Sequence, residues 1–492
     1  MHMRPGPTPK AGTRPPWVGL GAAVWVQIAS GNSYNFLLYS HSLKSVLGLN
    51  QRQLTMLGVA NDIGENVGIL PGMVCNHFPP WVVLSIGSVC CFFGYGLLWL
   101  SLSRTLQSLP YWLLWLALCV ATNSSAWLST AVLVTNMRNF LVNRGMVAGI
   151  LKGYAGLIAA VYTEIYRLLL HSSSPNLLGF LAVGVPILCL LVMNLVRPCT
   201  PSSRESSGES IHFVFIQVAG IVLGIYLLTT AVLGDILSTS PIISYIVLAT
   251  TAFLLVAPLM IPLKMTLYPP NVRNIGMDEQ ESYSSNAFVE EDSSEKTTPL
   301  LTPSSSEATF GGFNGNAESS DIAMLLAEGE GAVYKKRRPK RGEDFKFKEA
   351  IVKAHFWLLF LVFFVGVGSG VTVLNNLAQI GIALGFRDAA SLLSLFSFFN
   401  FVGRIGGGTR MLPRTVWLTF TQVIMIVVYL LSASGINGTL RAATGILGLC
   451  YGTQFSIMIP TVSELFGLKH FGLFYNFMSL GSPLGAYFSR AC

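Results

Sequence analysis

Charged residues are scarce in this 492-residue chain. Asp, Glu, Lys and Arg together make up 11% of it, less than half of the ~25% that is usual in soluble domains. Hydrophobic residues make up 52%. This balance excludes an ordinary water-soluble domain and is typical of a chain that lies in a lipid bilayer. We therefore expect an integral, multi-pass membrane protein.

Residues that commonly carry catalysis or bind metals are also sparse. The seven histidines are scattered, and no pair among the eight cysteines has CxxC or zinc-like spacing. With no catalytic arrangement of His, Cys or Ser, we expect no enzyme, no metal and no cofactor. The formal net charge of +8 comes from one dense basic run, Lys335 to Arg341, and from residues that flank apolar segments. This distribution argues against nucleic acid as a partner.

Long apolar stretches are abundant instead. Segments of ~20 residues, which as helices cross a ~30 Å hydrocarbon core, recur with short polar gaps. A barrel would need shorter, alternating segments, so we predict an all-α polytopic bundle. The thirteen predicted spans are Trp17–Tyr39, Leu54–Val74, Pro80–Ser101, Tyr111–Val134, Gly145–Tyr166, Leu177–Val196, His212–Leu233, Pro241–Leu263, Phe356–Asn376, Ala389–Gly403, Thr415–Ser434, Ala442–Thr461 and Phe471–Phe488.

These spans predict the domain organisation. Between 264 and 353 the chain has acidic and Ser-rich tracts, the basic run and too few apolar residues for a core, so we expect a disordered linker there. The predicted parts are a cytoplasmic tail (1–16), a six-helix bundle (17–196), two extra spans (197–263), the linker (264–353) and a second bundle (354–492).

The distribution of Lys and Arg predicts the orientation. With the N-terminus placed inside, about eleven of these residues lie at or beyond the inner span ends and about seven on the other side. Inner loops carry the excess of positive charge. The tail and the linker are therefore expected in the cytoplasm.

An internal repeat joins the two bundles. Asn66, Gly68 and Gly72 in the second span are echoed by Asn400 and Gly403, which precede a run of three glycines. Repeated bundles around a central cavity are a common design of transporters.

A set of motifs is spread over nearly the whole chain outside the linker. They are Tyr39-Ser40, Leu43-Lys44, Leu47-Gly48-Leu49-Asn50-Gln51, Asp62-Ile63-Gly64-Glu65-Asn66, Pro79-Pro80-Trp81, Asn143-Arg144-Gly145, Lys152-Gly153, Gly403-Arg404, Gly406-Gly407-Gly408, Ser463-Glu464-Leu465-Phe466-Gly467-Leu468-Lys469 and Tyr475-Asn476-Phe477. With these motifs the chain resembles the plant nodulin-like family of the major facilitator superfamily, the nuclear-fusion-defective-4-like membrane transporters.

The resemblance implies a major facilitator fold, with two pseudo-symmetric six-helix bundles and two extra spans between them. It also implies that the nodulin-like region continues to about residue 263. In the family the pattern runs on after Gly485 into a final helix, whereas this chain ends at Cys492. The last helix is therefore expected to be missing and the second bundle to be truncated.

Two carboxylates inside the second span are the strongest chemical signal. Asp62 and Glu65 share one helix face at i and i+3, and an ionisable group at membrane depth costs at least ~2.5 kcal/mol unless it meets a partner or water. Repulsion between them predicts that one holds a proton, so the pair is a candidate for proton coupling. The alternative is that they approach the cytoplasmic end and lock helices together.

Lys152 is the only lysine deep within a predicted span. It is a candidate for pairing with Asp62 or Glu65, or for binding an anionic substrate. The alternative is that it extends to the inner surface, since it lies about two turns into its helix.

Further candidates are polar residues in the spans. Arg404 and Glu464, at the inner span ends of the second bundle, are candidate gating or packing charges, with surface pairing as the alternative. The candidates for lining a substrate cavity, each of which could instead form an interhelical hydrogen bond, are Gln27, Asn32, Asn35, Asn66, Asn123, Asn375, Asn376 and Gln454.

The sequence thus predicts a secondary transporter that moves a small solute by alternating access, with the solute and protons as its partners. A carboxylate, a sugar and other metabolites all fit this prediction. The alternatives are a membrane sensor or scaffold that works through its linker, and a truncated isoform that does not transport. In the linker, Asp321 with Leu325 and Leu326 has the spacing of an acidic dileucine signal. It suggests contact with a sorting adaptor and a place in the vacuolar membrane or the plasma membrane.

Overall fold

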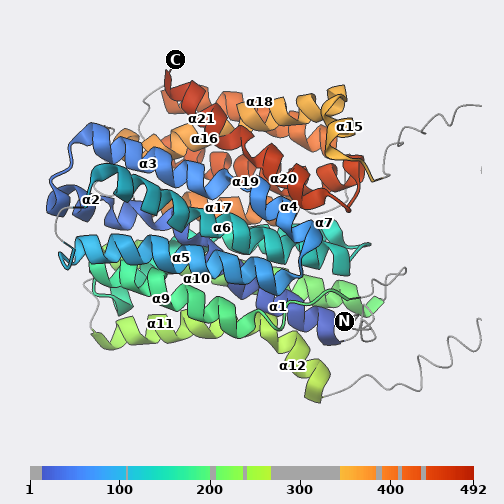
Figure 1. Ribbon diagram of the computed structural model, residues 1–492, viewed down its shortest axis with the longest axis horizontal. Coiled ribbons are helices and arrows are strands. Elements are labelled where there is room, and N and C mark those ends of the chain that lie inside the picture. The colour runs from blue at the N-terminus through green and yellow to red at the C-terminus, as the bar shows by residue number, and fades with distance from the viewer. Residues whose placement is uncertain are drawn as a thin grey trace, which may run out of the picture. The chain divides into compact units, whose positions relative to one another are not determined.

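The computed structural model describes residues 14–106, 109–199, 207–236, 241–267, 344–383, 390–407, 413–433 and 439–491, and all regular elements in these ranges are helical (Figure 1). In the first part of the chain the helices are α1 (Arg14–Ala29), η1 (Ser30–Asn35), α2 (Phe36–Leu47), α3 (Gln51–Asn66), α4 (Ile69–His77), α5 (Pro80–Leu102), α6 (Tyr111–Asn139), α7 (Arg144–Gly156), α8 (Ile158–Glu164), η2 (Ile165–Leu169) and α9 (Ser174–Val192). They are followed by α10 (Ser207–Ile236), α11 (Pro241–Val256), η3 (Ala257–Leu259), α12 (Met260–Leu267), α15 (Phe347–Ile351), α16 (Ala354–Ala383), α17 (Ala390–Gly407), α18 (Arg414–Ala433), α19 (Thr439–Phe466), α20 (Phe471–Ser479) and α21 (Gly481–Ala491).

Nine helices in the described ranges are long and apolar enough to cross a membrane. Each coincides with one of the thirteen predicted spans. Of the other four, the described part of 389–403 lies in the 18-residue α17, and 17–39, 54–74 and 471–488 fall on helices that are interrupted. The sequence therefore predicted where apolar helices occur, but it did not predict these interruptions.

The second span is interrupted at Val67 and Gly68, between α3 and α4. Val67 has φ −77° and ψ 75°, outside the helical region, so carbonyl groups near it lose their partners within the helix. The side-chain amide of Asn123 on α6 donates to the carbonyl oxygens of Gly64 at 2.9 Å and of Val67 at 2.8 Å. These bonds satisfy groups that would otherwise be costly at membrane depth.

Glycines bring the helices of the second bundle into backbone contact. A Cβ atom added at Gly448 on α19 would lie 2.6 Å from the carbonyl oxygen of Phe396 on α17. Gly403 on α17 and Gly452 on α19 face the partner backbone just as closely. Because lipid gives helices no hydrophobic reason to associate, such close packing is a main source of their stability.

Glycines bring the two bundles into close contact at two places. Gly72 on α4 lies against Gly472 on α20, where an added Cβ would be 2.5 Å from the carbonyl oxygen of Gly472 (Figure 1). On the other side, Gly156 on α7 faces the backbone of Phe401 on α17. In each case a helix of one bundle packs on a helix of the other.

The first extra span covers the second of these contacts. Gly220 on α10 lies against the Phe401 ring of α17, and the hydroxyl of Tyr154 on α7 donates to the carbonyl oxygen of Ile216 at 3.2 Å. The extra span thus contacts both bundles.

The structure differs from the predicted linker at both ends. Helix α12 continues to Leu267. The segment just before α15 packs against the end of α19 and the residues that follow it. There Phe345 is buried and its backbone N–H donates to the carbonyl oxygen of Phe466 at 3.1 Å. Asp344 accepts from the backbone N–H of Lys469 at 3.0 Å. The rest of the predicted linker, residues 268–343 with the dileucine-like sequence and the basic run, lies outside the described residues, as does most of the N-terminal tail.

We expect Gly448→Leu to lower the free energy of unfolding by about 1–3 kcal/mol, because the new side chain must push α17 away from α19. Thermal unfolding of the purified protein in detergent measures the change. Gly96→Leu is the matched control, since nothing lies within 4 Å of a Cβ at Gly96 on α5. Equal midpoints for the two variants would contradict the close packing of α17 and α19.

Candidate functional site

A cavity of about 460 Å³ lies between the two bundles. The first bundle contributes α1, η1, α2, α3, α6, α7 and α8, and the second contributes α16, α17, α19, α20 and α21. The polar and aromatic lining residues that matter below are Gln27, Ser33, Tyr34, Asp62, Glu65, Asn66, Ser129, Thr130, Lys152, Arg404, Tyr451, Phe455, Tyr475 and Asn476. A cavity of this size suits a small molecule.

Both predicted carboxylates lie in the cavity wall. Asp62 and Glu65 project from α3 and are partly exposed. Glu65 interacts electrostatically with Asp62 and Lys152, and the hydroxyls of Ser33 and Tyr34 lie beside it. The break that forms η1 turns Ser33 and Tyr34 toward this wall. The structure thus places the pair at the cavity, beside two hydroxyl groups.

Lys152 does not extend to the inner surface. It is 7% exposed on α7, where its ammonium donates to the hydroxyl of Ser129 at 2.7 Å and lies 5.2 Å from the centre of the Tyr475 ring. In the described part of the chain, no carboxylate lies within ion-pair distance of it. The direct pairing with Asp62 or Glu65 that the sequence suggested is therefore not formed in this structure.

Arg404 lies deeper than its place in the sequence indicated. Helix α17 runs one turn past the predicted span, and Arg404 is 2% exposed in the cavity wall. Its Nε donates to the Asn400 side chain at 2.9 Å and its Nη1 to the backbone carbonyl of Lys152 at 2.9 Å. The guanidinium also stacks 4.9 Å from the centre of the Phe455 ring. Arg404 thus connects the two bundles beside Lys152.

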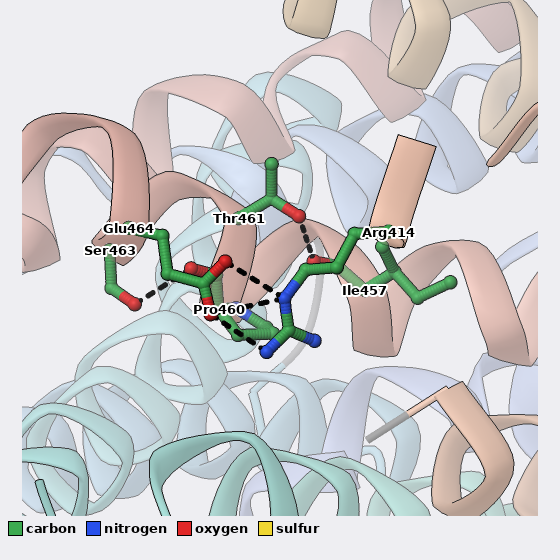
Figure 2. A network of polar contacts seen from close by, with 6 residues as sticks. All are labelled: Arg414, Ile457, Pro460, Thr461, Ser463 and Glu464. Atoms are coloured by element: carbon green, nitrogen blue, oxygen red, sulfur yellow. Dashed lines mark hydrogen bonds and ion pairs between the residues drawn. The ribbon is translucent and has the colours of Figure 1, made fainter. Parts of the chain in front are cut away.

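Glu464 pairs with Arg414 and does not line the cavity (Figure 2). The two carboxylate oxygens accept from Nε and Nη2 of Arg414 at 2.8–3.2 Å. The Glu464 side chain is 41% exposed, so water screens the pair. Figure 2 shows that the same turn of α19 contains Pro460, whose carbonyl oxygen accepts from the Ser463 hydroxyl. The pair joins α18 to α19 at a partly exposed position, so Glu464 here connects two helices of the same bundle.

Among the predicted cavity residues, Gln27 and Asn66 line the cavity. Asn32 donates to the Ser124 hydroxyl at 2.8 Å, and Gln454 donates to the Thr421 hydroxyl at 3.3 Å. These two form interhelical hydrogen bonds, as the alternative proposed.

Four further candidates remain. Asn123 bridges α6 to the break after α3. Asn35 is buried, and neither polar atom of its side chain has a hydrogen-bond partner in the described part of the protein. Asn375 and Asn376 belong to α16, but their side chains are outside the described residues.

Several cavity residues were not predicted. Tyr34, Ser129 and Tyr475 surround the charged groups. Their residue types are common in membrane helices, so nothing in composition distinguishes them. Only Tyr475 carried a signal, because it lies in one of the motifs of the second bundle.

The cavity is closed at the end where α4 meets α20. At this end of the cavity, Asn476 on α20 donates to the Thr130 hydroxyl on α6 at 2.9 Å and lies against Gly68. Farther along, Arg138 donates to the Asn76 side chain at 2.9 Å and to the Lys469 carbonyl at 3.1 Å. These contacts join the bundles at the predicted cytoplasmic end.

At the opposite end the lining reaches Gln51 and Thr55, which are exposed at the start of α3. The cavity is thus accessible from the side opposite the predicted cytoplasmic face.

The fold agrees with that of solved transporters. The structure of XylE, described as a proton:xylose symporter of the major facilitator superfamily, matches with a TM-score of 0.52 and 11% identity, covering 96% of this chain and 86% of that one. A double-Trp mutant of XylE gives a TM-score of 0.53, 11% identity and coverage of 96% and 87%. The chain therefore has the major facilitator fold, as predicted.

Residues 16–263 match the family model described as Nodulin-like, and residues 342–491 match the one described as NFD4, C-terminal domain. The chain belongs to the Nodulin-like family. It is 29% identical over 486 residues to Protein NUCLEAR FUSION DEFECTIVE 4 of Arabidopsis thaliana, covering 96% of this chain and 78% of that protein. It is also 28% identical over 181 residues to the uncharacterized MFS-type transporter YhjX of Escherichia coli (strain K12), covering 34% and 45%. The predicted family is confirmed.

We expect Asn123→Ala to lower the free energy of unfolding by about 1–3 kcal/mol, because it leaves three polar groups at membrane depth without a partner. These are the carbonyls of Gly64 and Val67 and the indole N–H of Trp127, which donates to Asn123 at 2.9 Å. Thermal unfolding in detergent is the measurement. Asn194→Ala, at an exposed position, is the matched control and should change the midpoint little. A loss no larger than that of the control would show that Asn123 does not stabilise the break.

Proposed function

We propose that this protein is a secondary transporter that moves a small solute together with protons by alternating access. The observation that carries the proposal is the placement of Asp62 and Glu65 in a cavity that both bundles line and that is open at one end. A cavity shared by two rocking bundles is the site at which alternating access operates.

The acid pair supplies a route for proton coupling. Two carboxylates one turn apart repel each other, and a proton on one of them relieves the repulsion. Because the pair faces the cavity, it exchanges protons with whichever side the cavity is open to. A solute that binds preferentially when the pair is protonated is then carried with the proton. XylE, which shares the fold, is itself described as a proton symporter.

The contacts between the bundles supply the second requirement, a closure that can open. The α4–α20 closure depends on small residues and on a few hydrogen bonds, those of Asn476 and Arg138 among them. Opening there and closing around Gln51 and Thr55 would expose the cavity to the other side. We place this cycle in the vacuolar membrane or the plasma membrane, with a sorting adaptor as a further partner through the linker.

A sensor or scaffold is the second candidate. The observation that favours it is the packing of Asp344 and Phe345 on the segment between α19 and α20, next to the α4–α20 closure. Through this contact the linker is joined to the part of the bundle that would have to move.

The test is uptake into vesicles that contain the purified protein and a trapped pH-sensitive dye, with a pooled metabolite mixture outside and an imposed pH difference. We expect the wild type to accumulate a solute together with protons. Asp62→Asn with Glu65→Gln should abolish accumulation against a gradient, while exchange of solute at equal concentrations continues, because only the proton carriers are lost.

Glu464→Gln is the matched control, since it neutralises a carboxylate outside the cavity. It should accumulate solute as the wild type does. Full proton-driven accumulation by the double variant would refute the role of the acid pair. A folded wild type that moves nothing across a broad panel would favour the sensor or scaffold instead.

A further inference from the structure

We propose that the solute is a small organic anion and that Lys152 and Arg404 bind its carboxylate group, one from each bundle. This inference rests on the proposed transport function and specifies the chemistry of its substrate. It follows from the surroundings of the two buried cations.

Lys152 is incompletely satisfied. An ammonium group has three donors, and that of Lys152 is given one hydroxyl, Ser129, and one aromatic face, Tyr475. Both partners are neutral. Burying a charge without a counterion is costly, and such groups inside membranes mark substrate or ion pathways. An anion in the cavity would supply the missing acceptor.

Arg404 likewise has only neutral partners among the described residues. Its contacts are the Asn400 amide, the backbone carbonyl of Lys152 and the Phe455 ring, with Tyr34 also beside it. None of these carries a negative charge in its ordinary state. Within the described residues no carboxylate lies at ion-pair distance from the guanidinium, so two buried cations share one cavity without a direct counterion.

A hydrogen bond links the segments that carry the two cations. The bond from Arg404 to the Lys152 carbonyl joins α17 of the second bundle to α7 of the first. It keeps both side chains in the same part of the cavity wall. A carboxylate has two oxygens and accepts strong, charge-assisted hydrogen bonds from lysine and arginine. Bound here it would contact both bundles, and the Tyr475 and Phe455 rings would flank the rest of the molecule.

The acid pair explains why an anion fits better than a zwitterion or a sugar. A neutral sugar would leave both cations without a counterion. The ammonium of an amino acid would occupy the carboxylates that the proposed mechanism needs for protons. An anion is opposed by Asp62 and Glu65 only while they are charged, so anion and proton favour each other's binding.

The test measures the thermal unfolding midpoint of the purified protein at increasing concentrations of matched probes at pH 7.5 and pH 5.5. D-gluconate is compared with D-glucose, lactate with L-alanine, and fumarate is added as a dianion. We expect at least one carboxylate to raise the midpoint in a saturable way, with a lower apparent Kd at pH 5.5. Glucose and alanine should have no effect. Glu65→Gln should weaken the pH dependence.

The variants identify the binding groups. Lys152→Met, which keeps the length and removes the charge, should raise the apparent Kd about tenfold or more. Lys152→Arg keeps the charge and should retain part of the affinity, which separates loss of binding from loss of folding. Arg414→Gln is the control, because it removes an arginine of the same bundle outside the cavity, and it should bind as the wild type does.

Three outcomes overturn the assignment: stabilisation by glucose or alanine but by no carboxylate, no stabilisation by any carboxylate, and carboxylate binding that Lys152→Met leaves unchanged. The uptake assay separates this inference from the proposed function. Proton-driven uptake of a neutral solute would leave the function standing and refute the anion. Carboxylate binding that depends on Lys152, without any uptake, would support the anion site and refute transport.

Discussion

The structure depends on one constraint: at membrane depth every backbone N–H and C=O group needs a partner within the protein. An uninterrupted helix satisfies it automatically, but such a helix presents only side chains to a cavity. The helices around the site are interrupted at Ser30–Asn35 and at Val67–Gly68, so the protein must replace the lost bonds. Asn123 does this for the second break. The Ser125 hydroxyl does it for the first by donating to the carbonyl of Ser30. Helix α6 supplies both side chains and thereby holds the breaks in place.

The low polarity of the membrane interior also governs the charged groups of the cavity. The described cavity wall contains two cations and two carboxylates, yet among the described residues the ion pair lies elsewhere, between Arg414 and Glu464 at a partly exposed position. The buried cations are held by neutral groups and aromatic rings. Because no described carboxylate lies at ion-pair distance from Lys152 or Arg404, these two cations remain able to respond to a ligand, whereas a closed buried pair would be expensive to open.

The sequence predicted the helices and the charged part of the site for the same reason. Apolar runs are long, and ionisable residues within them are rare enough that Asp62, Glu65 and Lys152 stand out. The sequence predicted less well the features that depend on contacts between different helices. The segment Ser30–Asn35 did carry a local signal, because Gly31, Asn32 and Asn35 are poor helix formers. The two asparagines were instead interpreted as candidates for lining the cavity. Arg404 was placed at the inner end because its helix was predicted to stop one turn early. The roles of Ser129 and Tyr475 depend on their meeting Lys152, which lies on another helix.

The backbone contact between α17 and α19 limits how the second bundle can move. Gly403, Gly448 and Gly452 leave no layer of side chains between the two helices, so neither helix can slide past the other without collision of main-chain atoms. Few internal degrees of freedom remain for this pair, and a displacement that starts at Arg404 on α17 is passed to α19 almost undiminished. Whatever motion the protein undergoes, these two helices move as one unit.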